Sequence, residues 1–328
     1  MRIFAIGTIL ALLLCSNNAL AAHVIRAPIQ DLLAPNNVIA VMRLSGFESH
    51  QTRGRFVTVQ NLWGTAQDTV SIALGDPKNA KLTPGTRYIV AYSMLRKHPY
   101  YRDITEPDPG GAHLVEVNVA GRALFADSNR LRFLIQSLQA PNPEPQPVLA
   151  ALLDVISASD ASTRLLAVFE FYMRQEMYAK GFTPELAKRY RALVEPKTLP
   201  AQEQEFLIRA WRFFPSRFRG KWITQTCRDS IQGNGIRYDL GSFIPLLMKT
   251  CAGLLGRNGA PTDLSLLSGL LKSNSPGVAK SALDALITLD PAAAESIATR
   301  ALESGGAASE TQRAIRAYLH TISKSANH

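Results

Sequence analysis

The sequence predicts a multidomain α+β protein in which a small all-β unit is followed by an all-helical one. Two periodicities support this fold class. Residues 37–125 contain short apolar runs, most of which alternate with a period of two, whereas residues 148–328 place apolar residues at helical spacing. A run of alternating prolines at 141–147 separates the two patterns. With 328 residues, the chain is long enough to form two cores.

The first 22 residues are typical of a secretory signal peptide. Arg2 precedes an almost wholly apolar run over residues 3–15. That run is too short to cross the ~30 Å core of a bilayer, which needs about 20 residues. Ala19 and Ala21 are small residues at the positions that a signal peptidase recognises. We therefore expect a periplasmic or secreted protein with no transmembrane segment after processing.

The first mature unit, residues 23–140, is expected to contain five strands. They are rich in β-branched residues and are bounded by turn signals such as Gly-Asp-Pro and Pro-Gly, a spacing typical of a small barrel or sandwich. The predicted strands are 37–44, 56–59, 70–74, 88–92 and 114–119. A helix should close the unit, with Asp127 or Ser128 as its cap. Its apolar stripe comprises Leu131, Leu134, Ile135 and Leu138.

Residues 57–64, 72–74 and 82–90 resemble the netrin-like modules, which are built on an OB-type barrel. Tissue inhibitors of metalloproteinases belong to that group. The resemblance covers part of the β unit and implies a barrel. It does not imply protease inhibition, because those inhibitors ligate the zinc of the protease through a disulfide-bonded N-terminal cysteine. Residues 22–140 of this chain contain no cysteine.

The prolines at 141–147 predict a linker between the two units. They alternate with polar residues, and such a stretch favours the extended polyproline II conformation of a semi-rigid spacer.

Residues 148–328 are expected to form a helical-repeat unit. Three helix pairs are predicted, at 148–156 with 163–178, 263–271 with 277–289, and 291–302 with 310–323. Repeated pairs of this kind are typical of an α-solenoid. Residues 275–286 resemble the second helix of a HEAT-type repeat, which implies stacked pairs with an extended surface. We expect 183–256 to be helical but irregular, and the glycine-rich stretch 253–259 to form a loop.

Cys227 and Cys251 are the two cysteines that remain after removal of the signal peptide. Each lies on an apolar helical stripe, and an oxidising compartment favours a disulfide between them. In the chain-entropy model, that disulfide would stabilise the fold by roughly 3–4 kcal/mol. The alternative is a pair of buried thiols.

The stretch 209–228 combines cations with interleaved aromatic residues, and no acidic residue lies between Glu205 and Asp229. Pro215 should separate two helices. Guanidinium groups bind phosphate and carboxylate bidentately, so this stretch is a candidate binding face for an anionic partner. The alternative is an ordinary amphipathic helix pair with solvated cations. The candidate residues are Arg209, Arg212, Arg217, Arg219, Lys221 and Arg228.

The sequence contains no serine-hydrolase, zinc-protease, P-loop or dinucleotide-binding motif, so it indicates no catalytic residue, cofactor or metal. His98 and His113 flank an acidic loop, which leaves open an enzymatic or metal site there. The net charge of +10 favours anionic envelope partners such as lipid or polysaccharide, while export argues against nucleic acid. Our leading hypothesis is an exported, non-catalytic adaptor whose helical repeats recognise a protein of the cell envelope.

Overall fold

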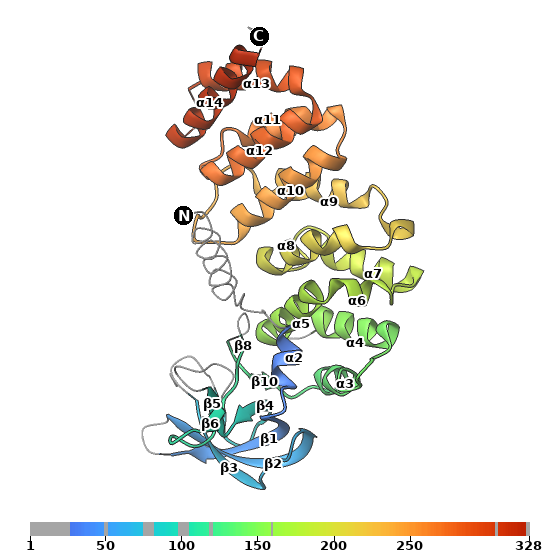
Figure 1. The fold of residues 1–328 in the computed structure, drawn as a ribbon, viewed down its shortest axis with the longest axis vertical. Coiled ribbons are helices and arrows are strands. Elements are labelled where there is room, and N and C mark those ends of the chain that lie inside the picture. The colour runs from blue at the N-terminus through green and yellow to red at the C-terminus, as the bar shows by residue number, and fades with distance from the viewer. Residues whose placement is uncertain are drawn as a thin grey trace, which may run out of the picture.

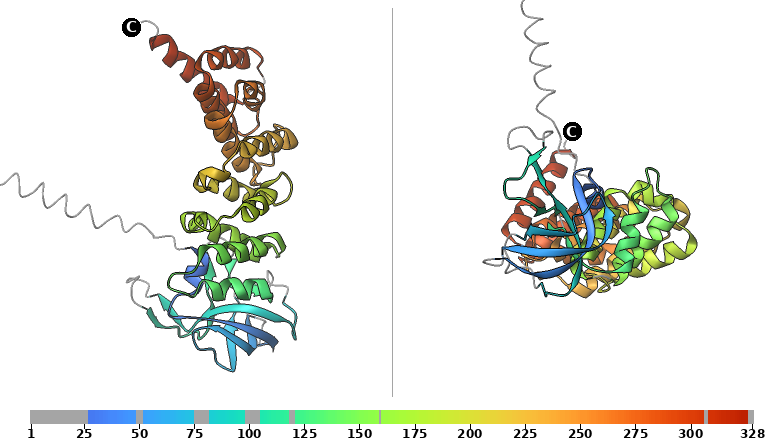
Figure 2. Two further views of the ribbon diagram at one scale, coloured as in Figure 1. Left: turned by 90° about the vertical axis from the view of Figure 1, so that its right-hand side faces the viewer. Right: turned by 90° about the horizontal axis from the view of Figure 1, so that it is seen from below.

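The computed structural model describes residues 27–48, 52–74, 82–97, 105–117, 121–158, 160–305 and 308–325. The predicted signal peptide lies outside these residues. A β-barrel occupies one end of the molecule, and helices stack away from it in an elongated column (Figure 1; Figure 2). Among the described helices, none combines the length and the apolar character needed to cross a membrane.

Five strands close the barrel, as the alternating runs predicted. The closed circuit is β1-β2-β3-β7-β4, and β4 pairs back with β1. The β3–β7 pairing is parallel, and the other four are antiparallel. The strands are β1 (Asn37–Phe47), β2 (Arg53–Trp63), β3 (Thr69–Ala73), β4 (Arg87–Ser93) and β7 (His113–Leu114).

Five further short strands extend this core. β10 (Leu124–Ala126) pairs with β4. β5 (Leu95–Lys97) pairs with β6 (Thr105–Pro107), and β8 (Glu116–Val117) pairs with β9 (Gly121–Arg122). The β5–β6 ribbon was not anticipated, because strands of three residues are too short for an alternating pattern to be recognised. The single strand expected at 114–119 is instead divided into β7 and β8, with Val115 between them, and residues 118–119 lie outside the described residues.

Strands β1 and β4 are buried on both faces. In β1, Ala40 and Met42 belong to the core inside the barrel, whereas Ile39 and Val41 belong to the core that the barrel shares with the helices. Residues buried on both faces give a continuous apolar run instead of an alternating one. This explains the uninterrupted apolar sequence of 38–42.

Two helices connect the barrel to the helical region. α2 (Pro28–Leu32) contacts both β1 and the first helix pair. α3 (Asn129–Ser137) begins as predicted, because the Oγ of Ser128 accepts a hydrogen bond from the backbone N–H of Leu131 at 3.2 Å. Leu131, Leu134 and Ile135 of its apolar stripe are fully buried.

The predicted extended linker at 141–147 is wrong over its second half. α4 (Pro145–Ala158) begins at Pro145, and proline is tolerated in the first turn of a helix. α3 packs directly on α4. The apolar core therefore continues without interruption from the outer face of the barrel into the helices.

The described helical region contains five antiparallel pairs in two layers. The second helices of successive pairs pack on one another in one layer, and the first helices form the other. Each pair joins a first and a second helix: α4 with α5 (Ala161–Met173), α7 (Pro184–Val194) with α8 (Ala201–Ala210), α9 (Trp222–Asn234) with α10 (Ile244–Asn258), α11 (Leu264–Leu270) with α12 (Pro276–Leu289), and α13 (Pro291–Glu303) with α14 (Ser309–Ser325). The short helix α6 (Gln175–Ala179) lies between the first two pairs.

Two sequence-based expectations are corrected here. The stretch 183–256 was expected to be irregular, but it holds two regular pairs, α7/α8 and α9/α10. The stretch 253–259 was expected to be a loop, but α10 continues to Asn258. Gly256 lies in that helix because α12 passes so close that a Cβ at this position would be 2.7 Å from the Cα of Ala285.

Candidate interaction surfaces

The connection between α8 and α9 carries most of the predicted basic face. It consists of two 3₁₀ turns, Trp211–Phe213 and Ser216–Phe218, on either side of Pro215. Pro215 thus separates two elements as expected, although they are short turns and not full helices. The six cations divide into two groups according to what they contact.

Arg209 and Arg228 form ion pairs with buried carboxylates. A guanidinium nitrogen of Arg209 lies 2.5 Å from the Oε1 of the fully buried Glu205. Arg228 binds Asp263 bidentately, at 2.6 Å and 2.9 Å. This interaction is the main cause of the lowered pKa of Asp263. These two arginines therefore stabilise the packing of helices.

The other four cations, Arg212, Arg217, Arg219 and Lys221, are exposed, and none has an ion-pair partner among the described residues. Arg217 donates to the carbonyl of Phe182 at 3.2 Å, and Arg219 donates to the carbonyl of Phe214 at 2.6 Å. Both guanidinium groups are held in place by main-chain oxygens that leave their charge uncompensated. The predicted face is thus reduced from six cations to four.

The aromatic residues interleaved with these cations are mostly core residues. Phe214 is buried and lies 4.3 Å from Phe182 and 5.0 Å from Tyr190, measured between ring centroids. Trp222 is half-buried and packs against the ring of Phe214. This part of the pattern serves the packing of α7, α8 and α9. Its exposed aromatic edges are limited to Phe213 and Phe218, which are half-buried beneath Arg212 and Arg217.

Cys227 on α9 and Cys251 on α10 are buried thiols in this structure. They lie on the two packed helices of one pair. Burial, and after it the neighbouring thiol of Cys251, raises the pKa of Cys227 well above its usual range. The disulfide between them stays a prediction.

The acidic loop flanked by His98 and His113 is only partly described, because His98 lies outside the described residues. The Nδ1 of His113 lies 3.0 Å from the Oδ2 of Asp108, and both side chains are half-buried. Among the described residues, no three His, Cys, Asp or Glu side chains converge as metal ligands would.

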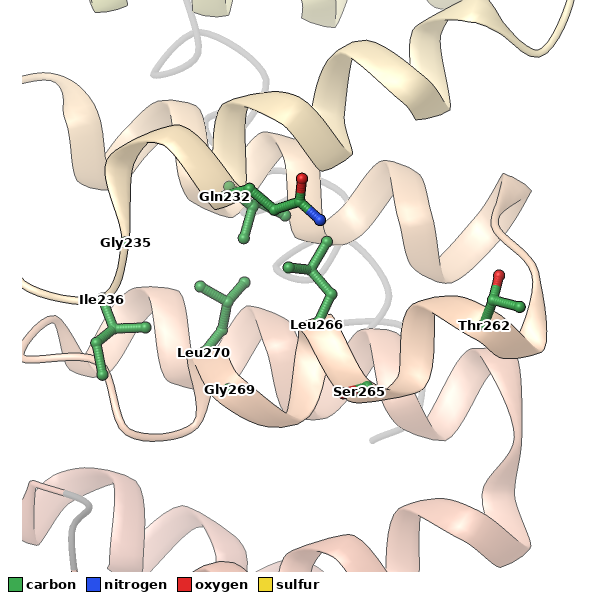
Figure 3. Close-up of a pocket in the computed structure, with 9 residues that line it drawn as sticks. Gln232, Gly235, Ile236, Thr262, Ser265, Leu266, Gly269 and Leu270 are labelled. Carbon is green, nitrogen blue, oxygen red and sulfur yellow. The ribbon is translucent and has the colours of Figure 1, made fainter.

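A different surface, not singled out in the sequence, is hollowed. An open hollow of about 400 Å³ lies between α9 and α11. Figure 3 shows Gln232 of α9 opposite Leu266 and Leu270 of α11, with Ile236 at one end and Thr262 at the other. Its wall is largely apolar.

A second hollow, of about 620 Å³, lies on the other side of α11, against α13. Ser265 lines both hollows, so they meet across α11. The α13 side is lined by hydroxyls and by two exposed cations, Lys272 and Arg300. Apolar side chains also line it: Leu264, Ala293, Ile297 and Ala301. We call the two hollows together the α11 trough.

The trough arises because α11 is shorter than its neighbours and carries small side chains on one face. It has 7 residues, whereas its neighbours α9 and α13 have 13 each. Ser265, Ser268 and Gly269 recur at i, i+3 and i+4, which places them on one helical face. The spacing was visible in the sequence, but the hollow also depends on where α9 and α13 lie.

Comparison with known proteins gives no match: no family model, no curated protein and no solved structure is similar to this chain.

Proposed function

We propose that this protein is an exported, non-catalytic adaptor that uses its helical-repeat surface to bind a protein of the cell envelope. The observation that carries the proposal is the α11 trough. Monomeric proteins usually fill the spaces between packed helices with side chains, so an open trough across three helices favours a role in recognition. The five stacked pairs present this surface on an extended scaffold.

The arrangement of the helices and strands supports the same role. Five stacked pairs, with α12 as the second helix of its pair, favour a HEAT-type solenoid. The closed five-strand circuit favours an OB-type, netrin-like barrel. Both folds are recognition scaffolds, although a fold alone does not define a function.

A second candidate function is attachment to an anionic lipid or polysaccharide. It is favoured by Arg212, Arg217, Arg219 and Lys221, whose charges are exposed and uncompensated among the described residues. Such binding would be strongly salt-dependent, because exposed charges are screened within about 8 Å at physiological ionic strength.

The test is crosslinking capture from the native cell envelope. The protein is expressed from its full-length sequence, so that the cell processes its N-terminus. A variant with Arg217→Glu and Arg219→Glu is used in parallel. We expect saturable capture of one specific protein by both forms.

The contrasting results separate the two functions. Capture of a protein by the wild type alone would move the binding site to the 209–228 face. Salt-sensitive binding to vesicles or polysaccharide, with no protein captured, would favour the second function. If neither a protein nor an anionic surface is bound, the adaptor proposal fails.

A further inference from the structure

We infer that the α11 trough binds an extended, acidic segment of the partner protein. This inference rests on the proposed adaptor function, and it names the site and the chemistry of the ligand. Three properties of the trough favour this ligand: the open surface of α11 at Gly269, its charge and its apolar end.

The surface of α11 lets a ligand approach closely. A Cβ built at Gly269 would meet no atom within 4 Å, so no side chain fills the surface of the helix at this position. The hydroxyls of Ser265 and Ser268 can each donate and accept a hydrogen bond, which suits the alternating N–H and C=O groups of an extended main chain.

The positive charge of the α13 side favours an anionic ligand. Lys272 and Arg300 line this hollow, and neither has an ion-pair partner among the described residues. None of the described residues that line either hollow is acidic. An aspartate or glutamate of the ligand would therefore meet two cations and no opposing carboxylate.

The α9 side selects for an apolar group. Its accessible apolar surface comes from Ile236 and Leu266, which are half-buried, whereas Leu270 is fully buried. A peptide can present an acidic side chain to one hollow and an apolar one to the other, which an anionic polysaccharide cannot.

The test is a selection of random nine-residue peptides displayed on phage, using the protein expressed from its full-length sequence. Affinities of the enriched peptides are then measured by fluorescence anisotropy. Two variants address the two hollows. Gly269→Trp fills the α9 side, where an added side chain meets open space. Lys272→Glu with Arg300→Glu reverses the charge of the α13 side.

Matched controls carry the same changes elsewhere. Gly233→Trp adds the same ring to α9 outside the lining residues, where a Cβ would meet only the tip of Lys197 at 4.0 Å. Lys249→Glu with Lys280→Glu reverses two exposed charges on the layer of second helices. Gly269→Leu adds a smaller side chain at the same position and replaces the tryptophan variant if that variant fails to fold.

We expect the enriched peptides to combine acidic and apolar residues. Each trough variant should weaken their binding by about tenfold or more, a loss that corresponds to about 1.4 kcal/mol, and the controls should not. The inference is overturned if no peptide is enriched, if the enriched peptides lack acidic residues, or if both trough variants bind like the controls. Capture of an envelope protein by Gly269→Trp would overturn this site and leave the adaptor function standing.

Discussion

At the residue scale, the buried carboxylate of Glu170 links the first helix pair to α2. It lies on α5, and its Oε2 accepts a hydrogen bond from the backbone N–H of Ile29 at 2.9 Å. Ala27, the N-cap of α2, has no side chain that could cap this helix. Glu170 supplies the missing acceptor from another element, and the hydroxyl of Tyr178 lies 3.4 Å from its other oxygen.

Burial raises the pKa of Glu170 above its usual value of 4.5, although the N–H of Ile29 and the charge of Arg174 oppose the shift. A folded-state pKa above the unfolded one means that folding takes up a proton. The stabilising contribution is therefore complete below the unfolded pKa, and it is lost as the pH rises through the folded pKa.

Substitution of Glu170 should separate its charge from its hydrogen bonds. Glu170→Gln keeps an oxygen for Ile29 but cannot ionise, so it should reduce the loss of stability that follows as the pH rises above 4.5. Glu170→Ala leaves the buried N–H of Ile29 without an acceptor and should destabilise the fold by about 1–3 kcal/mol. Urea unfolding over a series of pH values, from below 4.5 upward, measures these effects.

The exposed Glu176 on α6 provides the control, because Glu176→Gln removes a carboxylate in contact with water. If Glu170→Gln and Glu176→Gln show the same pH dependence as the wild type, the buried carboxylate does not contribute to it.

At the scale of elements, the glycines of α10 determine how closely this helix packs on α12. A Cβ at Gly256 would lie 2.7 Å from the Cα of Ala285 and 2.9 Å from its Cβ. The same addition at Gly253 would meet only the guanidinium of Arg257, at 3.7 Å. Two glycines in one helix thus have different roles.

We expect Gly256→Ala to destabilise the protein by about 1–3 kcal/mol, because two backbones must move apart. Gly253→Ala should be neutral or stabilise by up to about 1 kcal/mol, since alanine restricts the unfolded chain. Thermal unfolding followed by circular dichroism distinguishes them. Equal effects of the two substitutions would show that the close contact of α10 with α12 is absent.

We expect a disulfide between Cys227 on α9 and Cys251 on α10, which thiol labelling can test. Protein isolated from its native compartment, unfolded without reductant and treated with N-ethylmaleimide, should take up no label. After reduction, it should take up two labels and lose roughly 3 kcal/mol of stability. Two labels before reduction would establish that the cysteines remain thiols.

Local patterns predicted elements well where the chain is regular. The short apolar runs predicted the positions of the five barrel strands, although only the first part of the expected 114–119 strand belongs to the circuit. The Ser128 cap and its stripe predicted α3. Such patterns failed where a proline or glycine lies in a structure other than the one it usually indicates. Pro145 and Pro147 indicate an extended linker by composition, yet they fit the first turn of α4. Gly253 and Gly256 suggest a loop, yet packing against α12 keeps them helical.

At the scale of the whole molecule, the barrel and the helices share one apolar core. Ile39 and Val41 of β1, Leu32 of α2 and Leu149 of α4 all belong to it and are fully buried. No local pattern reveals this continuity, because it depends on contacts between residues more than a hundred positions apart. The trough was missed for the same reason, since its walls come from three separate helices.

The 209–228 face shows the limit of composition as a guide to a site. Its six cations and interleaved aromatic residues suggested one binding surface. Two of the cations instead neutralise Glu205 and Asp263, and the rings of Phe214 and Trp222 pack with other aromatic residues. The Arg209–Glu205 pair has the i, i+4 spacing of a helix and could be recognised in the sequence. The Arg228–Asp263 pair could not, because Asp263 is distant in sequence from Arg228.

The most direct test of the account is to map the crosslinks in the captured complex by mass spectrometry, using an amine-reactive reagent. Lys272 lines the trough, whereas Lys249 and Lys280 lie on the layer of second helices. The account predicts crosslinks from Lys272 to the partner that disappear in Gly269→Trp and persist in Gly233→Trp. Crosslinks confined to Lys249, Lys280 or the barrel, or no captured partner at all, would contradict it.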